Sequence, residues 1–168
     1  MRLFFALWPP AKTAHALAQW THRVVHEAGG TPTPSENIHL TLAFLGDADP
    51  ANAGNAAKRV QAAPHALPID HAHYWKHNKI LWVGPQTMPE ALAALVSQLH
   101  SALKERGFVL EDRAFAAHIT LLRKANAPNA LPLLPHVEWP VNEMLLVRSR
   151  TSPKGSTYEP VERFPLTG

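Results

Sequence analysis

Two short segments of the chain share one order of residue types: a histidine, an aliphatic residue, a threonine and a leucine. They are His39–Leu42 and His118–Leu121, and the second begins 79 residues after the first in a chain of 168 residues. Each lies in an apolar run that predicts a buried strand, in which successive side chains point to opposite faces. The histidine and the threonine of each segment therefore share one face, while the aliphatic residues point into the core.

An imidazole exchanges a proton close to neutral pH, and a neighbouring hydroxyl can donate a hydrogen bond to an anion. A single His-x-Thr pair on a strand is more often a half-buried polar pair than a catalytic group. Two copies in similar surroundings change this interpretation, because together they supply one general acid and one general base. The candidate catalytic residues are therefore His39, Thr41, His118 and Thr120.

The segments around the two pairs resemble the 2H phosphoesterases, and among them the bacterial and archaeal RNA 2′,3′-cyclic phosphodiesterases, a family also described as 2′-5′ RNA ligase-like. The resemblance rests on Asn37–Gly46 and Arg113–Lys124, with support from Arg2–Leu7, Leu145–Ser149 and Tyr158. It covers nearly the whole chain. One residue departs from the family pattern, since the second motif is usually preceded by proline and here follows Ala117.

The resemblance implies an α+β fold of the bilobal, LigT-like kind. Such a fold has two pseudo-symmetric lobes of mainly antiparallel sheet, with helices packed outside and a central cleft that the two His-x-Thr strands face. We expect residues 1–168 to form a single domain of two intertwined lobes. The alternation of predicted strands and helices agrees with the α+β class, but periodicity alone does not order the strands.

The resemblance also implies hydrolysis of RNA 2′,3′-cyclic phosphate ends to 2′-phosphates, with His39 as proton donor and His118 as proton acceptor. Opening the ring with water needs a base on one side of phosphorus and an acid on the other. Thr41 and Thr120 would hold non-bridging oxygens, whose charge must be stabilised in the transition state. The expected partners are RNA ends or nucleotides bearing a 2′,3′-cyclic phosphate. No metal, other cofactor or obligate protein partner is expected, and the protein is expected to be a monomer.

Two further residues match the family pattern, Phe44 and Arg123, each five positions after its histidine. The resemblance gives Arg123 a phosphate contact and Phe44 a stacking face for a base. Packing in the core is an equally open interpretation for Phe44. An odd offset falls on the opposite face of a regular strand, so both residues need a bend or a strand end to reach the cleft. The residues do not by themselves predict that bend.

The composition excludes several classes of protein. The chain has no cysteine, which excludes disulfides and cysteine-ligated zinc and is usual for a cytoplasmic protein. The apolar run after Met1 ends at Trp8 and is too short for a signal peptide, and no segment approaches the length that spans a membrane. The net charge of +3 says little about polyanion binding, because the basic residues are scattered. We therefore expect a cytoplasmic protein without membrane contact.

The elements that position the motifs are predicted from hydrophobic periodicity and cap residues. The expected helices run from Pro9-Pro10 to about Ala28, from Asp49 to about Ala63, and from Thr87 to Arg106, where Thr87 and Glu90 would form a capping box. The expected strands are Arg2–Leu7, Ile69–Trp75, Lys79–Val83, Glu143–Arg148 and Glu159–Phe164, besides the two that carry the motifs. A proline-rich loop is expected from Ala127 to Pro140.

Other histidines and other functions complete the set of hypotheses. His22 and His26 have the spacing of a metal-binding pair, but they lack the glutamate of a His-Glu-x-x-His site and are assigned to a solvated helix face. His71, His73 and His77 are interpreted as strand and turn residues. RNA 2′-5′ ligase activity and a non-catalytic RNA-end-binding protein with the same cleft are the alternative functions, and a histidine-rich metal-binding protein is the third.

Overall fold

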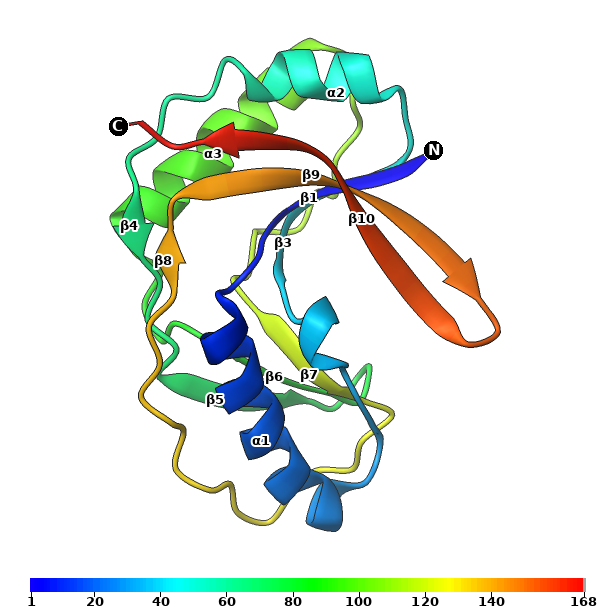
Figure 1. Ribbon diagram of the computed structural model, residues 1–168, viewed down its shortest axis with the longest axis vertical. Helices are drawn as coiled ribbons and strands as arrows, with labels where there is room; N and C mark the ends of the chain where they lie inside the picture. Colours follow the sequence, from blue (N-terminus) through cyan, green and yellow to red (C-terminus); the bar gives the residue numbers. More distant parts are fainter. Residues whose placement is uncertain (168) are drawn as a thin grey trace.

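The computed structural model describes residues 1–167, which form two four-stranded antiparallel sheets flanked by helices (Figure 1). The first sheet has the order β10-β9-β1-β3, with β1 at Arg2–Leu7, β3 at Leu40–Asp47, β9 at Glu143–Ser152 and β10 at Gly155–Pro165. The second has the order β2-β7-β6-β5, with β2 at Thr31–Pro32, β5 at His71–Trp75, β6 at Ile80–Gly84 and β7 at Ile119–Arg123. A two-stranded sheet pairs β4 (His65–Ala66) with β8 (Pro140–Val141).

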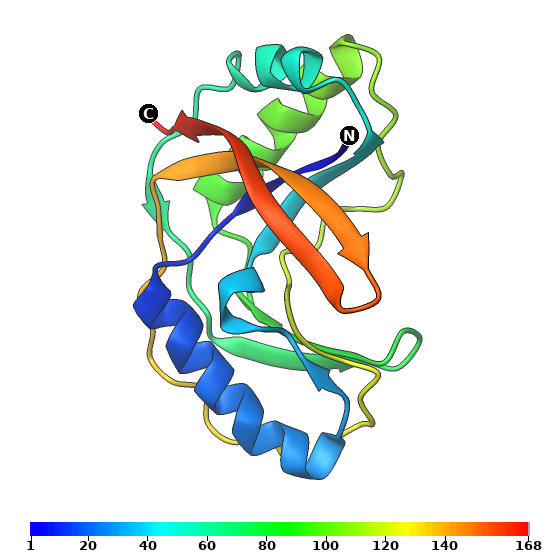
Figure 2. The same ribbon diagram turned by 45° about the vertical axis from the view of Figure 1, so that its right-hand side comes forward.

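The helices lie at the two outer ends of the molecule, with the sheets between them (Figures 1 and 2). Helix α1 (Ala11–Ala28) packs against the second sheet, and a short 3-10 helix, η1 (Ser35–Asn37), leads from β2 into β3. Helices α2 (Pro50–Ala57) and α3 (Glu90–Glu105) cover the first sheet, where His100 of α3 bonds through Nε2 to the carbonyl of Leu42 at 2.8 Å. The predicted α+β class is confirmed.

Each sheet takes strands from both halves of the chain. The first sheet joins β1 and β3 to the C-terminal hairpin β9–β10, and the second adds β2 to strands from the middle of the chain. Helix α1 precedes the first motif in sequence but packs on the sheet that carries the second motif. The two motifs are thus on different sheets, and neither sheet corresponds to one half of the sequence.

Strand β1 is buried on both faces, which explains its unbroken apolar sequence. Phe5 and Leu7 join the main core beneath the helices, whereas Phe4 and Ala6 join a smaller cluster on the other face with Leu145 and Val147 of β9. Alternate residues of one strand therefore serve two different apolar layers.

Several predicted boundaries are confirmed, and others are wrong. Strand β1 has its predicted bounds, Arg2–Leu7, and Asp49 caps α2 at the predicted start by accepting from the Asn52 amide at 3.3 Å. Helix α2 ends at Ala57 rather than Ala63, because Gln61 leaves the helix to exchange two 2.8 Å hydrogen bonds between its backbone and the side chain of Gln98.

The predicted capping box at the start of α3 does not form. The helix begins at Glu90, so Pro89 is the N-cap residue and no side chain caps the helix. Pro89 has an extended backbone (ψ 141°), which places Thr87 outside the first turn.

The C-terminal hairpin is longer than predicted, because its outer residues are polar and exposed and so show no apolar alternation.

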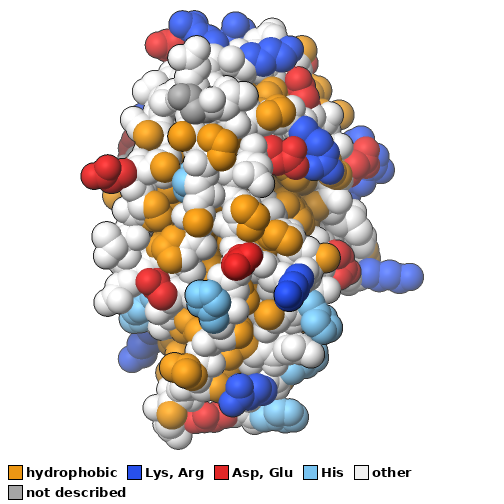
Figure 3. Space-filling view, turned by 60° about the vertical axis from the view of Figure 1, so that its left-hand side comes forward, with side chains coloured by type: hydrophobic (Ala, Val, Ile, Leu, Met, Phe, Trp, Pro, Cys, Tyr) orange, Lys and Arg blue, Asp and Glu red, His pale blue; other side chains and the backbone are white. Residues whose placement is uncertain are grey.

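The face of the molecule drawn in Figure 3 carries charges of both signs. Figure 3 shows basic and acidic side chains interspersed among apolar patches on one face, in agreement with the scattered basic residues of the sequence. None of the helices in residues 1–167 combines the length and the apolar character that crossing a bilayer requires.

Candidate active site

All six residues singled out in the sequence line one cleft between the two sheets, with a volume of about 590 Å³. We call it the histidine cleft. Its lining includes His39, Thr41 and Phe44 from the first sheet and His118, Thr120 and Arg123 from the second. The C-terminal hairpin closes one side with Ser149, Ser156 and Tyr158. The fold therefore brings the two motifs together. Each histidine lies one residue before the first residue of its strand, β3 or β7.

Both motif histidines are held by the same backbone hydrogen bond. Nδ1 of His39 lies 2.6 Å from the carbonyl oxygen of Asn37, and Nδ1 of His118 lies 2.9 Å from that of Ala116. A carbonyl can only accept, so Nδ1 carries the proton in each ring and Nε2 has the free lone pair in the neutral form. Each imidazole thus turns a basic nitrogen toward the cleft.

The threonines of the two motifs lie beside their histidines. The hydroxyl of Thr41 is 3.1 Å from Nε2 of His39, so this hydroxyl touches the nitrogen that would exchange a proton. Thr120 is held through its backbone carbonyl, which accepts a 2.9 Å bond from the hydroxyl of Thr33. Both threonine side chains are partly exposed to the cleft.

A β-bulge in each motif strand brings Phe44 and Arg123 to the cleft. In the pairing of β1 with β3, Phe5 faces Ala43 while its neighbour Ala6 faces Thr41, so β3 has one extra residue. The same shift occurs between β6 and β7, where Leu81 faces Leu122 and Trp82 faces Thr120. Such a bulge reverses the alternation of side chains beyond it.

The bulges explain how Phe44 and Arg123, each five positions after its histidine, reach the same face of the strand as that histidine. After each threonine, two consecutive apolar residues are buried, Leu42-Ala43 in one strand and Leu121-Leu122 in the other. The next residue therefore returns to the face of the histidine and threonine. Two adjacent apolar residues in an otherwise alternating segment are the sequence feature that could have indicated the bulge.

Aromatic rings surround both imidazoles. The indole of Trp8 stacks on His39 with centroids 4.7 Å apart and planes at 11°, and Tyr158 meets the same ring edge-on at 5.2 Å. On the other wall, Trp75 lies 4.8 Å and Trp82 6.2 Å from His118. The three tryptophans were not predicted to belong to the site, and their spacing in the sequence gives no indication of it.

Burial in these aromatic surroundings lowers the pKa of both histidines. Desolvation is the main cause, and it lowers the pKa of His39 from 6.5 to about 4 in spite of the opposing hydrogen bond to Asn37. Desolvation likewise lowers the pKa of His118. The guanidinium of Arg123 disfavours a second positive charge and contributes to the lowered pKa of each imidazole. Both rings are neutral in the free protein at neutral pH.

The cleft is built for an anion. Arg2 and Arg123 line it, and among residues 1–167 no aspartate or glutamate does. Arg123 also makes no ion pair with a carboxylate of this part of the chain. An uncompensated guanidinium close to both imidazoles is suited to bind a phosphate group.

The substitution of alanine for the usual proline before the second motif leaves the local geometry intact. The hydrogen bond of His118 to the carbonyl two residues earlier matches that of His39. The neighbouring strand supports this segment closely, since a Cβ atom added to Gly84 would lie 2.5 Å from the carbonyl oxygen of Ala117.

The remaining histidines lie outside the cleft. His22 and His26 are exposed on α1, as predicted, and His71 and His73 stack on each other on β5 at 5.8 Å. Within residues 1–167, no group of three or more histidine, cysteine, aspartate or glutamate side chains is arranged to hold a metal ion.

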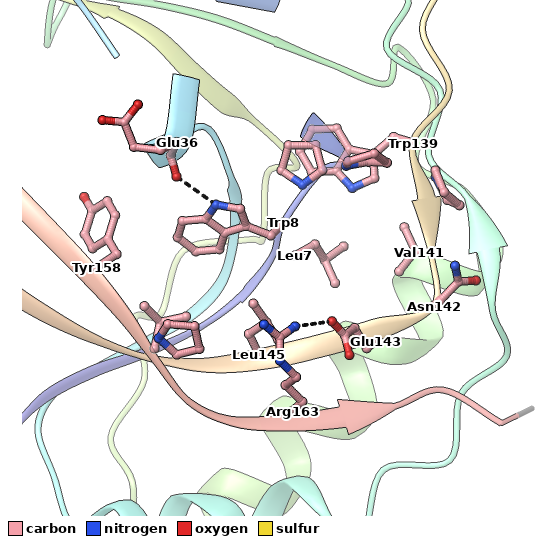
Figure 4. Close-up of a pocket in the computed structure, with 15 residues that line it drawn as sticks. Leu7, Trp8, Glu36, Trp139, Val141, Asn142, Glu143, Leu145, Tyr158 and Arg163 are labelled. Atoms are coloured by element: carbon pink, nitrogen blue, oxygen red, sulfur yellow. Dashed lines mark hydrogen bonds and ion pairs between the residues drawn. The ribbon is translucent and has the colours of Figure 1, made fainter. Parts of the chain in front are cut away.

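A larger cavity of about 660 Å³ lies behind Trp8 (Figure 4). Tyr158 lies on one side of it and Val141 and Asn142 on the opposite side, while Arg163, paired with Glu143 at 2.6 Å, lies between them. The indole nitrogen of Trp8 donates to the backbone carbonyl of Glu36 at 3.0 Å. The indole stacked on His39 therefore separates this cavity from the motif histidines.

Comparisons with known proteins agree with this geometry. The family model described as "LigT like Phosphoesterase" matches the chain twice, over residues 7–82 and 83–158. The chain is 33% identical to the RNA 2′,3′-cyclic phosphodiesterase of Escherichia coli (strain K12), over 99% of this chain and 97% of the relative. It is 34% identical to the protein of the same name from Thermus thermophilus, over 100% of this chain and 91% of the relative. The crystal structure of E. coli LigT complexed with 3′-AMP superimposes with a TM-score of 0.91 at 30% identity, covering 99% of this chain and 98% of that one.

Proposed function

Since the chain belongs to the LigT-like phosphoesterase family, we propose that it is an RNA 2′,3′-cyclic phosphodiesterase, a hydrolase that opens 2′,3′-cyclic phosphate ends to 2′-phosphates. One observation in this structure supports the proposal independently of family membership. Two imidazoles with the same fixed Nδ1 proton lie on opposite walls of one cleft that holds two arginines and, in residues 1–167, no carboxylate.

The reaction needs two proton transfers in line through phosphorus. Nε2 of His118 removes a proton from water, which attacks phosphorus, and the bond to the 3′ oxygen breaks. Nε2 of His39 protonates that departing oxygen, so the 2′-phosphate remains. The proton balance then closes by return of a proton from His118 to His39 through solvent.

The non-bridging oxygens gain charge during the attack and need donors. The hydroxyls of Thr41 and Thr120 and the guanidinium of Arg123 are the donors in this proposal, because they line the cleft beside the two imidazoles. Phe44 is 63% exposed and offers its ring to the base of the terminal nucleoside.

The low pKa of His39 leaves its Nε2 unprotonated in the free protein, so this nitrogen must gain a proton when substrate binds. The cyclic phosphate carries one negative charge, which offsets Arg123 and favours an imidazolium beside it. The substrate thus helps to create the acid that the reaction requires.

Both proton transfers and the charge stabilisation are assigned to side chains and not to a metal. We therefore expect full activity after treatment with EDTA, measured as hydrolysis of a 2′,3′-cyclic nucleotide before and after chelation. If chelation abolished the activity and zinc or manganese restored it, the assignment of both transfers to histidines would be wrong.

The function itself is tested by product analysis on an oligoribonucleotide that ends in a 2′,3′-cyclic phosphate. The proposal predicts a 2′-phosphate end as the product. Binding without turnover would indicate an RNA-end-binding protein, and a 2′-5′ linked product on addition of RNA with a 5′-hydroxyl end would indicate a ligase. A monomeric state and a cytoplasmic location are part of the proposal and are tested by sedimentation and by fractionation of cells.

A further inference from the structure

The histidine cleft continues beside His118 into a second depression of about 380 Å³. The two share four lining residues, which are Thr41, Phe44, Ile80 and His118. The depression is bounded on one side by Trp75, His77 and Asn78, at the turn between β5 and β6. On the other side it is bounded by the segment 110–116, which includes Arg113 and Phe115. We call it the Trp75 groove.

We propose that the Trp75 groove binds the second nucleotide of an RNA whose cyclic phosphate end occupies the histidine cleft. The inference rests on the proposed function and extends it, because it makes an RNA strand rather than a mononucleotide the preferred substrate. A volume of about 380 Å³ lies within the range of small-ligand sites.

Aromatic rings at the groove are available for stacking. Trp75 is only partly buried although its ring centroid lies 4.8 Å from that of His118, and the ring of His77 lies 5.9 Å from that of Trp75. Phe44 lines both the cleft and the groove. Single-stranded nucleic acids bind proteins through such rows of rings, because every base has a face that can stack.

The charges around the groove suit a phosphodiester. The side chain of Arg113 is 78% exposed, and only one of its terminal nitrogens is engaged, at 3.1 Å from Glu111. Arg113 lines the groove together with His118, and its positive charge helps to lower the pKa of that histidine. The adjoining turn adds two exposed lysines, Lys76 and Lys79. The bounding segment also contains Asp112, so three basic residues stand against two carboxylates, Glu111 and Asp112.

The larger cavity behind Trp8 is less suited to an RNA strand. Its charged residues are Glu36, Glu143 and Arg163, and the arginine is already paired with Glu143 at 2.6 Å. One carboxylate is left uncompensated, which disfavours a polyanion. The indole of Trp8, which lines this cavity (Figure 4), is also stacked on His39.

The experiment compares two substrates with the same terminal nucleoside, a 2′,3′-cyclic mononucleotide and a dinucleotide that ends in the same 2′,3′-cyclic phosphate. The quantity measured is the ratio of kcat/KM for the dinucleotide to kcat/KM for the mononucleotide. We expect this ratio to be about tenfold or more in the wild-type protein, since one stacked base contributes a factor of roughly 5 to 100.

Two variants test the residues of the groove. Trp75→Leu is expected to slow both substrates, because Trp75 packs on His118, and to bring the ratio close to one. Arg113→Gln is expected to lower the ratio severalfold through loss of the phosphodiester contact. The ratio cancels any common effect on the chemical step, so it isolates the second nucleotide.

Each variant has a matched control. Trp8→Leu removes the indole that packs on the other catalytic histidine and should slow both substrates equally, leaving the ratio unchanged. Arg59→Gln removes an exposed arginine that is paired with Glu105 at 3.5 Å and lines neither cleft nor groove, and it should leave both rates unchanged.

Binding of uncleaved products separates this inference from the proposed function. The wild-type protein should bind a dinucleotide with a 2′-phosphate end more tightly than the corresponding 2′-mononucleotide, and Trp75→Leu should remove the difference. If the protein hydrolysed neither cyclic substrate, the proposed function would be wrong. The ratio of the two affinities would still test whether the groove binds the second nucleotide. Equal ratios in wild type and Trp75→Leu, in both rate and affinity, would overturn the inference, as would a Trp75→Leu effect confined to the mononucleotide.

Discussion

The two motif histidines have the same tautomer because each Nδ1 donates to the carbonyl two residues earlier in the chain. The basic nitrogen of both rings therefore faces the cleft, and the role of acid or base depends on which ring holds a second proton. Burial and the Arg123 guanidinium oppose that proton in both rings. Substrate charge is the factor that differs between the free and the bound protein.

This electrostatic arrangement predicts a difference between two pH profiles. The profile of kcat/KM reports the free protein and kcat reports the bound complex. The bound phosphate raises the pKa of the histidines, so both limbs of the bell-shaped kcat profile should lie at higher pH than those of kcat/KM. The limbs of kcat are expected in roughly the histidine range of pH 5 to 8. Coincident profiles, with a limiting chemical step, would contradict this account.

The Arg123→Gln variant tests whether this guanidinium lowers the pKa of the two histidines. Removing the positive charge should raise the pKa of both imidazoles and move the limbs of kcat/KM to higher pH, besides lowering kcat/KM itself. The measurement is the pH dependence of kcat/KM on a 2′,3′-cyclic nucleotide. Unmoved limbs would show that the guanidinium does not act on the histidines.

Residue types and spacing were sufficient to predict four of the residues that line the cleft, because each His-x-Thr pair is local to one strand. The indoles beside the imidazoles were not predicted. Trp8 reaches His39 and Trp75 reaches His118 across 31 and 43 residues of sequence, so their contacts follow from tertiary packing alone.

At the level of the strands, the paired bulges in β3 and β7 decide which side chains enter the cleft. They turn Phe44 and Arg123 to the face of the histidines, where regular alternation would have buried them. The sequence indicates the bulges only through two adjacent apolar residues after each threonine, a pattern that a strand end would also produce. The offset of five residues could therefore be recognised but not explained before the strand pairing was known.

Strand β6 holds the second motif through a close backbone approach at Gly84, which gives a prediction for this element. Gly84→Ala would place a Cβ atom against the carbonyl of Ala117, the residue before His118. We expect lower kcat together with a lower melting temperature, because rigid backbone must move. Gly54→Ala is the control, since its Cβ would come close only to the flexible carboxylate of Glu162, at 2.7 Å, and would meet Phe164 at the ordinary contact distance of 3.9 Å, so it should leave kcat unchanged. Wild-type kcat in Gly84→Ala would contradict the proposed support of the motif.

At the level of the whole molecule, the site exists only because the chain crosses between the two sheets. The C-terminal hairpin completes the sheet of the first motif, and α1 covers the sheet of the second. The class of fold could be predicted from the alternation of elements, with the two-lobed arrangement coming from the resemblance. The strand order could not, because the pairing of β1 with β9 joins residues 139 to 145 positions apart.

The buried imidazole also links the stability of the whole fold to pH. His39 has a pKa of about 4 in the folded protein against 6.5 in the unfolded chain, so the unfolded chain binds more protons between these values. The free energy of unfolding should therefore fall as pH decreases from about 6.5 to 4. His39→Gln should show a shallower decrease, measured by urea unfolding at several pH values, whereas His22→Gln on the exposed face of α1 should match the wild type. Equal slopes in all three proteins would contradict the assigned burial of His39.

The central claim is that His39 and His118 act together as acid and base on a 2′,3′-cyclic phosphate, and single and double alanine variants test it most directly. His39→Ala and His118→Ala should each lower kcat by roughly 10²–10⁴ or more. The double variant should lose far less than the product of the two losses, because the pair acts as a unit. His22→Ala should retain the wild-type rate. Full activity in either folded motif variant, or a loss in His22→Ala as large as in His39→Ala, would contradict the account.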